Sequence, residues 1–187
     1  FPGTKGAEGI VNMLFGDTAP EGRLTMCFPR SVGQCPIFYN MLPTDHSPEF
    51  VTHYVTGYID SPIEPLYSFG EGMTYTDFEY GEIVLDKSKL RPGESLTASV
   101  TVKNVGGRDG SETVQLYIRD VYASVSRPVK ELKGFKKVQV KAGETVNVEF
   151  ALTCDDLRFH NAQMEYVWEP GEINLFIGKS SLCTEYK

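Results

Sequence analysis

The feature that most constrains the fold is a repeated alternation of apolar and polar residues in the second half of the chain. Apolar side chains occupy every second position in five segments: residues 96–102, 114–118, 138–140, 146–150 and 173–177. Turns containing Gly or Pro separate these segments, at residues 92–94, 106–107, 142–144 and 170–171. Successive side chains of a strand point to opposite faces, so the pattern indicates strands with one buried face each. With residues 78–85 and a short piece near Tyr166, it predicts roughly seven strands in an antiparallel β-sandwich.

Residues 1–43 follow a different pattern, which predicts a helix, a turn and a strand. Apolar residues recur at helical spacing in the first turns of the chain: Ala7, Ile10, Val11, Leu14 and Phe15. Thr4 is expected to cap the start of this helix, and Gly16 is expected to end it. Residues 23–28 are short and apolar enough for a strand closed by Pro29. One helix and one strand cannot bury a sheet on both faces, so residues 1–43 are expected to pack on residues that are either upstream of them or in another chain.

The stretch PLYSFGEGMTYTDFEY, residues 65–80, is the predicted joint between the two patterns. Gly70 and Gly72 flank Glu71 and permit a tight turn, while aromatic residues give the stretch more apolar surface than a loose linker carries. We therefore expect it to fix the two parts together, with a hairpin turn inside one sheet as the alternative. The predicted organisation is an α/β-type segment at residues 1–43, a connection at 44–76 and the β-sandwich at 77–187.

Composition excludes several classes of protein. The chain has 187 residues, of which 41% are hydrophobic and 23% charged, as in globular proteins. Its formal net charge is −7 and no Lys/Arg cluster interrupts that balance, which argues against nucleic acid and anionic membrane surfaces as partners. No apolar run approaches membrane-spanning length. Because the chain begins at Phe1 without a Met, we expect it to be a piece of a longer protein.

No metal, cofactor or nucleophile motif is recognisable. The four cysteines, Cys27, Cys35, Cys154 and Cys183, contain no Cys-x-x-Cys spacing and are expected to be buried or half-buried free thiols. The histidines His46, His53 and His160 show no metal-ligand spacing. Residues 3–6, GTKG, precede the predicted helix but lack the second Gly, Lys and Ser/Thr of a phosphate-binding loop. The sequence therefore predicts no metal site, no cofactor and no Ser-His-Asp or Cys-His arrangement.

Several separated motifs resemble family 3 glycoside hydrolases, and in particular their bacterial periplasmic β-glucosidases. Residues 1–40 resemble the closing segment of the α/β sandwich domain of that family, and residues 65–80 resemble the exit from it. The runs SRPVKELKGFKKV and EYVWEPGEINLFIG resemble the appended fibronectin type III-like domain. The resemblance implies a mainly β chain, in which a fibronectin type III-like antiparallel sandwich follows a helix–strand remnant of an α/β sandwich domain.

The resemblance also implies where the chemistry lies. Retaining glycosidases use two carboxyl groups about 5 to 5.5 Å apart, one as nucleophile and one as acid/base. In the family the nucleophilic Asp belongs to a barrel domain and the acid/base Glu precedes the segment matched by Phe1, so no catalytic residue is predicted in this chain. The carboxylates nearest the joint are expected to be surface or turn residues: Asp45, Glu49, Asp60, Glu64, Glu71 and Asp77. Asp155 and Asp156 are expected to cap a turn or short helix. The loop after Asn40 departs from the family pattern, so no sugar contact is assigned to it.

Two functions follow from these observations. The first is the C-terminal portion of a retaining β-glucosidase-like enzyme that hydrolyses terminal β-D-glucosyl residues, in which this chain is a scaffold without the catalytic pair. Its expected partners are the missing barrel and sandwich domains, and β-glucosides or oligosaccharides for the whole enzyme. The alternative is a non-catalytic β-sandwich module that binds carbohydrate or protein. The resemblance favours a periplasmic or secreted location and leaves a cytoplasmic one open.

Three local features of the sequence carry further expectations. Trp168 is expected to anchor the core or an interface, with sugar stacking as the alternative. Residues 122–128 are too long for a tight hairpin and are expected to contact a neighbouring domain. Ile10, Val11, Leu14 and Leu24 are expected to form an exposed apolar patch that makes the isolated chain self-associate.

Overall fold

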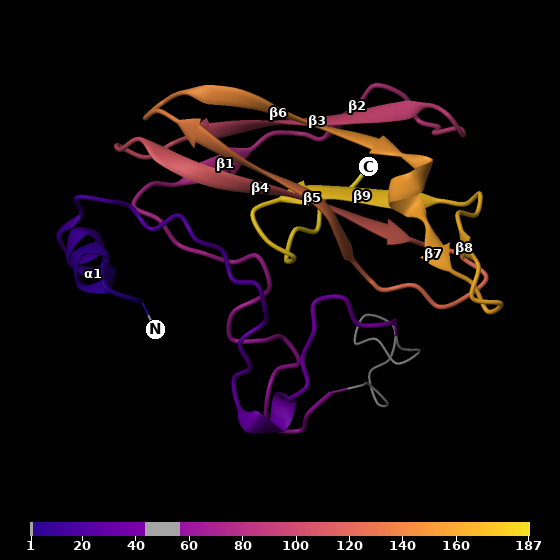
Figure 1. The fold of residues 1–187 in the computed structure, drawn as a ribbon, viewed down its shortest axis with the longest axis horizontal. Coiled ribbons are helices and arrows are strands. Elements are labelled where there is room, and N and C mark those ends of the chain that lie inside the picture. The colour runs from indigo at the N-terminus through magenta and orange to yellow at the C-terminus, as the bar shows by residue number, and fades with distance from the viewer. Residues whose placement is uncertain (1, 44–56) are drawn as a thin grey trace.

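The computed structural model describes residues 2–43 and 57–187, and its main body is a sandwich of two antiparallel sheets (Figure 1). In one sheet, β3 (Ser95–Asn104) pairs with β1 (Phe78–Tyr80) and β2 (Val84–Leu85) on one side and with β6 (Thr145–Thr153) on the other. In the other sheet, β4 (Gly110–Asp120) lies between β5 (Glu131–Val140) and β9 (Ile173–Gly178). A hairpin of β7 (Phe159–His160) and β8 (Tyr166–Val167) follows the 3₁₀ turn η2 (Cys154–Leu157). The predicted mainly β sandwich is confirmed.

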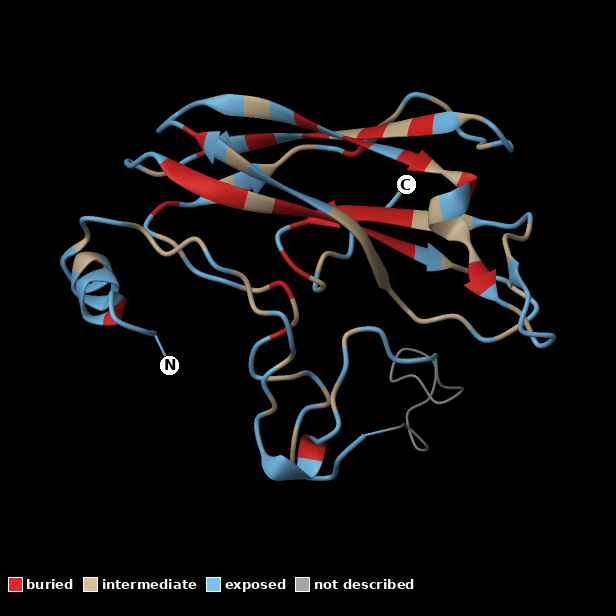
Figure 2. Ribbon diagram, viewed as in Figure 1, coloured by how far each residue is buried: buried red, intermediate tan, exposed pale blue. Residues whose placement is uncertain are grey.

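The core lies between the sheets and follows the predicted alternation. Ala98, Val100 and Val102 of β3 are buried, and the paired Val148 and Phe150 of β6 are buried beside them. Val114, Leu116 and Ile118 of β4 and the apolar residues of β9 close the core from the opposite sheet. Figure 2 shows these buried stretches on the facing strands. Burial of one side-chain face on each strand is what stabilises a sandwich of this kind.

Strand β4 departs from simple alternation because it is buried on both faces. Besides its core-facing residues, Ser111, Gln115 and Tyr117 are buried on the opposite face. The chain that precedes the sandwich covers this second face, as described below. An antiparallel sheet normally leaves one face to solvent, so a doubly buried strand marks a contact with another part of the chain.

The N-terminal helix α1 (Gly6–Phe15) forms as predicted, but its first residue is capped differently. The prediction that Thr4 caps the helix is wrong: Lys5 occupies the N-cap position and no side chain there donates or accepts a capping hydrogen bond. The prediction for Gly16 is confirmed, because it ends the helix in the left-handed conformation with φ 81°. The Tyr75 hydroxyl donates a hydrogen bond to the carbonyl of Met13 and ties the helix to the joint.

The predicted strand at residues 23–28 is wrong, although the segment is extended beside residues 66–71. Only a single bridge, Phe28 with Tyr67, has strand geometry. At the start of the segment, the Leu24 amide donates to the Glu71 carbonyl and the Gly70 amide donates to the Leu24 carbonyl, both at 2.8 Å. Gly70 has φ 79° and turns the chain out of register, so the two segments never form a regular ladder. A short 3₁₀ turn, η1 (Val32–Gln34), follows.

The first strands of the sandwich, the turn η2 and the connecting segment were also predicted from the sequence. The residues expected as one strand at 78–85 form the two separate strands β1 and β2. Asp156 caps η2 as expected, accepting hydrogen bonds from both the amide and the hydroxyl of Thr153. Of the connection at 44–76, residues 57–64 are irregular, and residues 44–56 lie outside the described ranges. None of the helices in the described ranges has the length and hydropathy needed to span a bilayer.

Candidate functional site

A buried polar contact joins the N-terminal segment to the sandwich. We call this contact the seam and define it by Arg23, Tyr39 and residues 69–70 on one side and Glu112, Gln115 and Tyr117 of β4 on the other. Arg23 and Glu112, which contact each other directly, are 89 positions apart in the sequence. Figure 1 shows the segment running along the sheet that contains β4.

The first part of the seam is a buried ion pair. Arg23 Nη2 lies 2.7 Å from Glu112 Oε2, and the two side chains are only 10% and 3% exposed. The Tyr80 hydroxyl donates to Glu112 Oε1 at 2.8 Å, so the carboxylate is held between the N-terminal segment and strands of both sheets. Burial raises the pKa of the Glu112 carboxyl, while the hydrogen bond from Tyr80 and the charge of Arg23 act in the opposite direction. The pair therefore compensates a carboxylate that the core would otherwise reject.

The second part of the seam is a hydrogen-bond relay around Gly70. Gln115 Nε2 donates to the Gly70 carbonyl at 3.0 Å and to the Lys179 carbonyl at 2.7 Å, and its Oε1 accepts from the Tyr117 hydroxyl at 2.6 Å. A Cβ atom on Gly70 would lie 2.1 Å from Gln115 Oε1. Glycine is therefore required at position 70 both by the positive φ and by the close approach of β4.

Stacked aromatic rings form the third part. The rings of Tyr39 and Phe69 stack with centroids 4.2 Å apart, and Tyr39 meets Tyr117 edge-on at 5.9 Å. The Ser181 amide donates to the Phe69 carbonyl at 3.0 Å, which joins the same site to the chain after β9. Burial raises the pKa of the Tyr117 hydroxyl, so it stays a neutral donor to Gln115. Together the three parts fix the joint to the sandwich, as the aromatic content of residues 65–80 predicted.

Two further buried side chains brace the chain around the seam. Asn104 is fully buried; its Oδ1 accepts from the Thr76 hydroxyl at 2.6 Å and its Nδ2 donates to the Arg108 and Val140 carbonyls. Gln34 donates to the Pro62 carbonyl at 2.8 Å and ties η1 to the connection. Each fixes a loop that lacks regular pairing of its own.

The loop at residues 122–128 faces the N-terminal segment. Just after it, the Val129 amide donates to the Met41 carbonyl at 2.9 Å. Arg127 lies 4.5 Å from the centre of the Phe159 ring. Lys130 donates to the Ser181 carbonyl at 2.8 Å, and burial lowers the pKa of its amine. The expected contact of this loop with a neighbouring domain stays a prediction, since the described contacts lie within this chain.

Four of the carboxylates singled out from the sequence lie within the described ranges, at the surface or in a turn. Asp60, Glu64 and Asp77 are exposed, and Glu71 accepts a hydrogen bond from the Ser68 amide inside its own turn. Asp45 and Glu49 lie outside the described residues. Glu112 was not predicted from the sequence, although a signal was present: it shares the strand parity of the core residues Val114 and Leu116. A glutamate in register with core positions requires a charged partner.

Two shallow grooves contain other carboxylates. One, of about 350 Å³, is lined by Pro43 and the loop after β4, and it includes Asp120, whose pKa is raised by burial. The other, of about 330 Å³, includes Glu94 and Asp155. Both of those carboxylates have cationic partners, Lys87 at 3.4 Å and Arg158 at 2.9 Å. The absence of a catalytic carboxyl pair from this chain stays a prediction.

The remaining predicted residues have other positions. All four cysteines are free; Cys154 is buried, Cys27 and Cys183 are half-buried, and Cys35 is exposed, contrary to expectation. Trp168 is half-buried in the second groove rather than in the core. Within residues 2–43 and 57–187, no three potential metal ligands cluster together. His46 and His53 lie outside these ranges.

Comparison with known proteins finds two family matches in the chain. Residues 1–75 match the glycosyl hydrolase family 3 C-terminal domain, and residues 112–181 match the fibronectin type III-like domain. A periplasmic β-glucosidase of Salmonella typhimurium is 45% identical over 97% of the chain, and a β-xylosidase of Formosa agariphila is 41% identical over the whole chain. These matches cover 24% and 25% of the two relatives.

A solved structure is also similar to this chain over its whole length. The crystal structure of a β-glucosidase from Listeria innocua in complex with glucose superposes with a TM-score of 0.93 at 44% identity. The superposition covers all of this chain and 26% of the Listeria protein. The chain therefore spans about a quarter of the length of these relatives. The chain belongs to glycoside hydrolase family 3 and corresponds to the C-terminal part of such enzymes, including the fibronectin type III-like domain.

Proposed function

We propose that this chain is the C-terminal scaffold of an exo-acting retaining β-glycosidase, which removes terminal β-D-glucosyl or β-D-xylosyl residues. In this proposal the catalytic nucleophile and the acid/base are supplied by the barrel and sandwich domains of the whole enzyme. The chain holds the last part of the α/β sandwich domain on a rigid β-sandwich. The names of the relatives, which include a β-glucosidase and a β-xylosidase, support this substrate class.

The observation that carries the proposal is the seam. A free-standing binding module needs no buried tie to a preceding segment, yet Arg23 and Glu112 form a nearly solvent-free ion pair across this contact. Positioning matters in an active site, because displacement of a reacting group by about 1 Å can lower the rate about 100-fold. A β-sandwich fixed to residues 1–43 would limit such displacement in the domain that they complete.

The exposed face of α1 indicates where the rest of that domain would pack. Leu14 and Phe15 are 77% and 80% exposed, and Ile10 and Val11 are about half exposed. Leu24, which was expected to belong to this patch, is half-buried beside Glu71. An apolar helix face of this kind is stable in water only when another surface covers it. In the proposal, the remainder of the sandwich domain covers it, and self-association of the isolated chain is the expected substitute.

The test is a chimera in which this chain replaces the matching C-terminal region of the Salmonella periplasmic β-glucosidase. We expect the isolated 187-residue chain to be inactive on aryl β-D-glucosides and aryl β-D-xylosides, and the chimera to hydrolyse at least one of them. The relative truncated before the matching region is expected to be inactive or insoluble.

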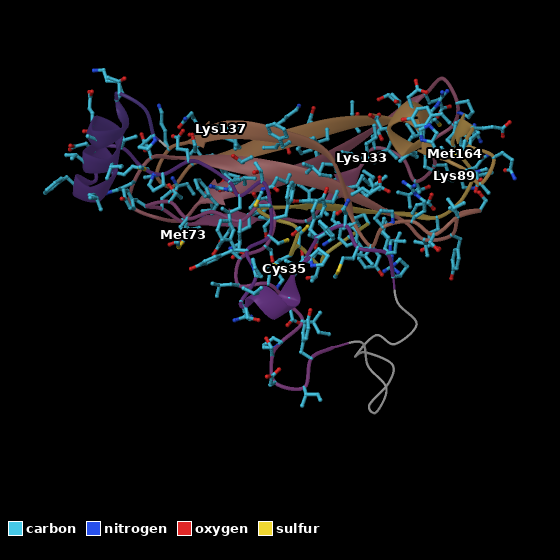
Figure 3. The ribbon with its side chains drawn as sticks, turned by 60° about the horizontal axis from the view of Figure 1, so that its bottom comes forward. Cys35, Met73, Lys89, Lys133, Lys137 and Met164 are labelled. Atoms are coloured by element: carbon cyan, nitrogen blue, oxygen red, sulfur yellow. The ribbon has the colours of Figure 1, made fainter. Side chains whose placement is uncertain are left out.

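A matched pair of chimeras tests the scaffold role itself. Arg23→Met breaks the buried ion pair, whereas Lys137→Met removes an exposed pair with Glu21 across the same two parts. Lys137 lies on β5, on the side of the sandwich nearer to α1 (Figure 3). We expect the first chimera to lose activity at lower temperature than the second. A folded, soluble chimera without activity would contradict the proposed substrate class, and equal behaviour of both variants would contradict the scaffold role.

A further inference from the structure

The second groove lies at the end of the sandwich that carries β7 and β8, away from α1 and the seam (Figure 1). Its walls are the turn before β3, the beginning of η2 and the residue after β8. Lys89 and Met164, from the loop before β3 and the β7–β8 turn, both lie at this end (Figure 3). The groove volume, about 330 Å³, is at the lower end of the range for small-molecule sites. We call it the Trp168 groove.

The groove combines the flat indole of Trp168 with charged side chains, Arg158 and Asp155 among them. Trp168 is half-buried and lines the groove with Pro92, so part of its side chain faces the open space. Beside it, Arg158 has two neighbours: its Nε lies 2.9 Å from Asp155 Oδ1 in a partly exposed ion pair, and its guanidinium carbon lies 5.8 Å from the centre of the Tyr166 ring. The terminal N–H donors of a guanidinium held in this way are available to another acceptor.

The charges of the groove indicate an uncharged ligand. Glu94 is paired with Lys87, and Asp155 is paired with Arg158, so each anionic side chain has a cationic partner at the groove. An anionic ligand would meet two carboxylates, and a cationic ligand would displace existing partners. A neutral ligand with many hydroxyl groups can accept from Arg158 and donate to Asp155 without leaving a charge unpaired.

We propose that the Trp168 groove is a non-catalytic binding site for a short neutral oligosaccharide. A pyranose ring presents an apolar C–H face that stacks on indole, and hydroxyl groups at its rim that hydrogen-bond to planar side chains. The choice of glucose- or xylose-based oligosaccharides rests on the proposed function; the groove itself predicts only a neutral sugar. The site would retain the enzyme on its polymeric substrate.

The chain is suited to a direct test because Trp168 is its only tryptophan. Titration of the 187-residue chain with cellobiose and with xylobiose is expected to change the Trp fluorescence in a saturable way for at least one of them. Arg158→Gln is expected to weaken that binding at least about tenfold, the loss that a charge-assisted hydrogen bond represents. Trp168→Ala, followed by calorimetry in place of fluorescence, is expected to abolish it.

The matched control is Phe135→Ala on β5, which removes another exposed aromatic side chain outside the groove and is expected to leave binding unchanged. Circular dichroism checks that each variant is folded. A flat fluorescence and calorimetric response of the folded parent chain to both disaccharides would overturn the proposal. Equal affinity of the parent and the folded Arg158→Gln variant would do so as well. The assay measures no hydrolysis, so its failure leaves the chimera experiment intact, and failure of the chimera leaves the groove intact.

Discussion

Arg23→Met is the substitution whose effect follows most directly from the structure. It removes the cation that lies 2.7 Å from Glu112 and leaves a carboxylate that is 3% exposed without its charged partner. Breaking a buried ion pair from one side typically costs about 3 to 5 kcal/mol. For a domain of this size, that corresponds to a fall in the melting temperature of roughly 6 to 20 °C. The fluorescence of Trp168, far from the substitution, reports unfolding of the sandwich.

The pH dependence of that loss gives a second, independent reading. The pKa of Glu112 is already raised by burial in the folded state, and removal of Arg23 raises it further. A carboxyl with a raised folded-state pKa takes up a proton on folding, so its contribution to stability grows as the pH falls through that pKa. We therefore expect the cost of Arg23→Met, measured by urea unfolding, to be smaller at about pH 5 than at about pH 8.

A double-mutant cycle isolates the pair from other effects. Glu112→Gln keeps the acceptor for Tyr80 but removes the charge, so the double variant is expected to cost about 1 to 3 kcal/mol less than the sum of the single variants. Lys137→Met is the control, since its pair with Glu21 is substantially exposed and is worth less than about 1 kcal/mol. A loss below about 1 kcal/mol for Arg23→Met, with no coupling in the cycle, would refute the view that this pair fastens the two parts.

Three further substitutions test other parts of the same contact. In urea unfolding, Gly70→Ala should destabilise the protein by about 2 to 5 kcal/mol, because the new Cβ would clash with Gln115. Gly93 has the same φ of 79° but open space around it, so Gly93→Ala should cost only about 1 to 2 kcal/mol. Equal costs for the two variants would exclude the clash. Asn104→Ala removes four side-chain hydrogen bonds and should cost about 3 to 5 kcal/mol by the same assay, and a loss near zero would contradict its bracing role. Burial lowers the pKa of Lys130, so between that lowered pKa and the ordinary value of 10.5 the unfolded state binds more protons than the folded state. The parent should therefore gain stability relative to Lys130→Met as the pH rises through this window. A stability difference that does not change with pH would argue against a desolvated amine.

The sandwich was predictable because its signal is local. Alternation along β3 and β6 depends only on which residues occupy every second position, and both strands appear where that pattern placed them. The same holds for the helix end at Gly16, where a single glycine supplies the left-handed conformation. The division at residues 43 and 76 remains a prediction, because the seam makes residues on both sides of each boundary pack on the same sheet.

The failures have a common physical cause. Residues 23–28 have the composition of a strand, yet their partner contains Gly70 in a conformation that interrupts a ladder. Thr4 is a favourable capping residue by type, but Lys5 occupies the position at which the cap would act. In both cases the residue type was suitable, and its position relative to the neighbouring backbone was not.

Local pattern alone determined that this chain contains a helix followed by an antiparallel β-sandwich, and its motifs pointed to the family. Tertiary structure decided which residues do more than fill that fold: it brought Arg23 to Glu112 across 89 positions of sequence and closed the outer face of β4 with Tyr39 and Gly70. Hydrophobic periodicity specifies which face of a strand is buried, because that depends on its own residues. Which side chain pairs with a buried charge depends on how distant segments pack, so the local sequence pattern does not reveal it.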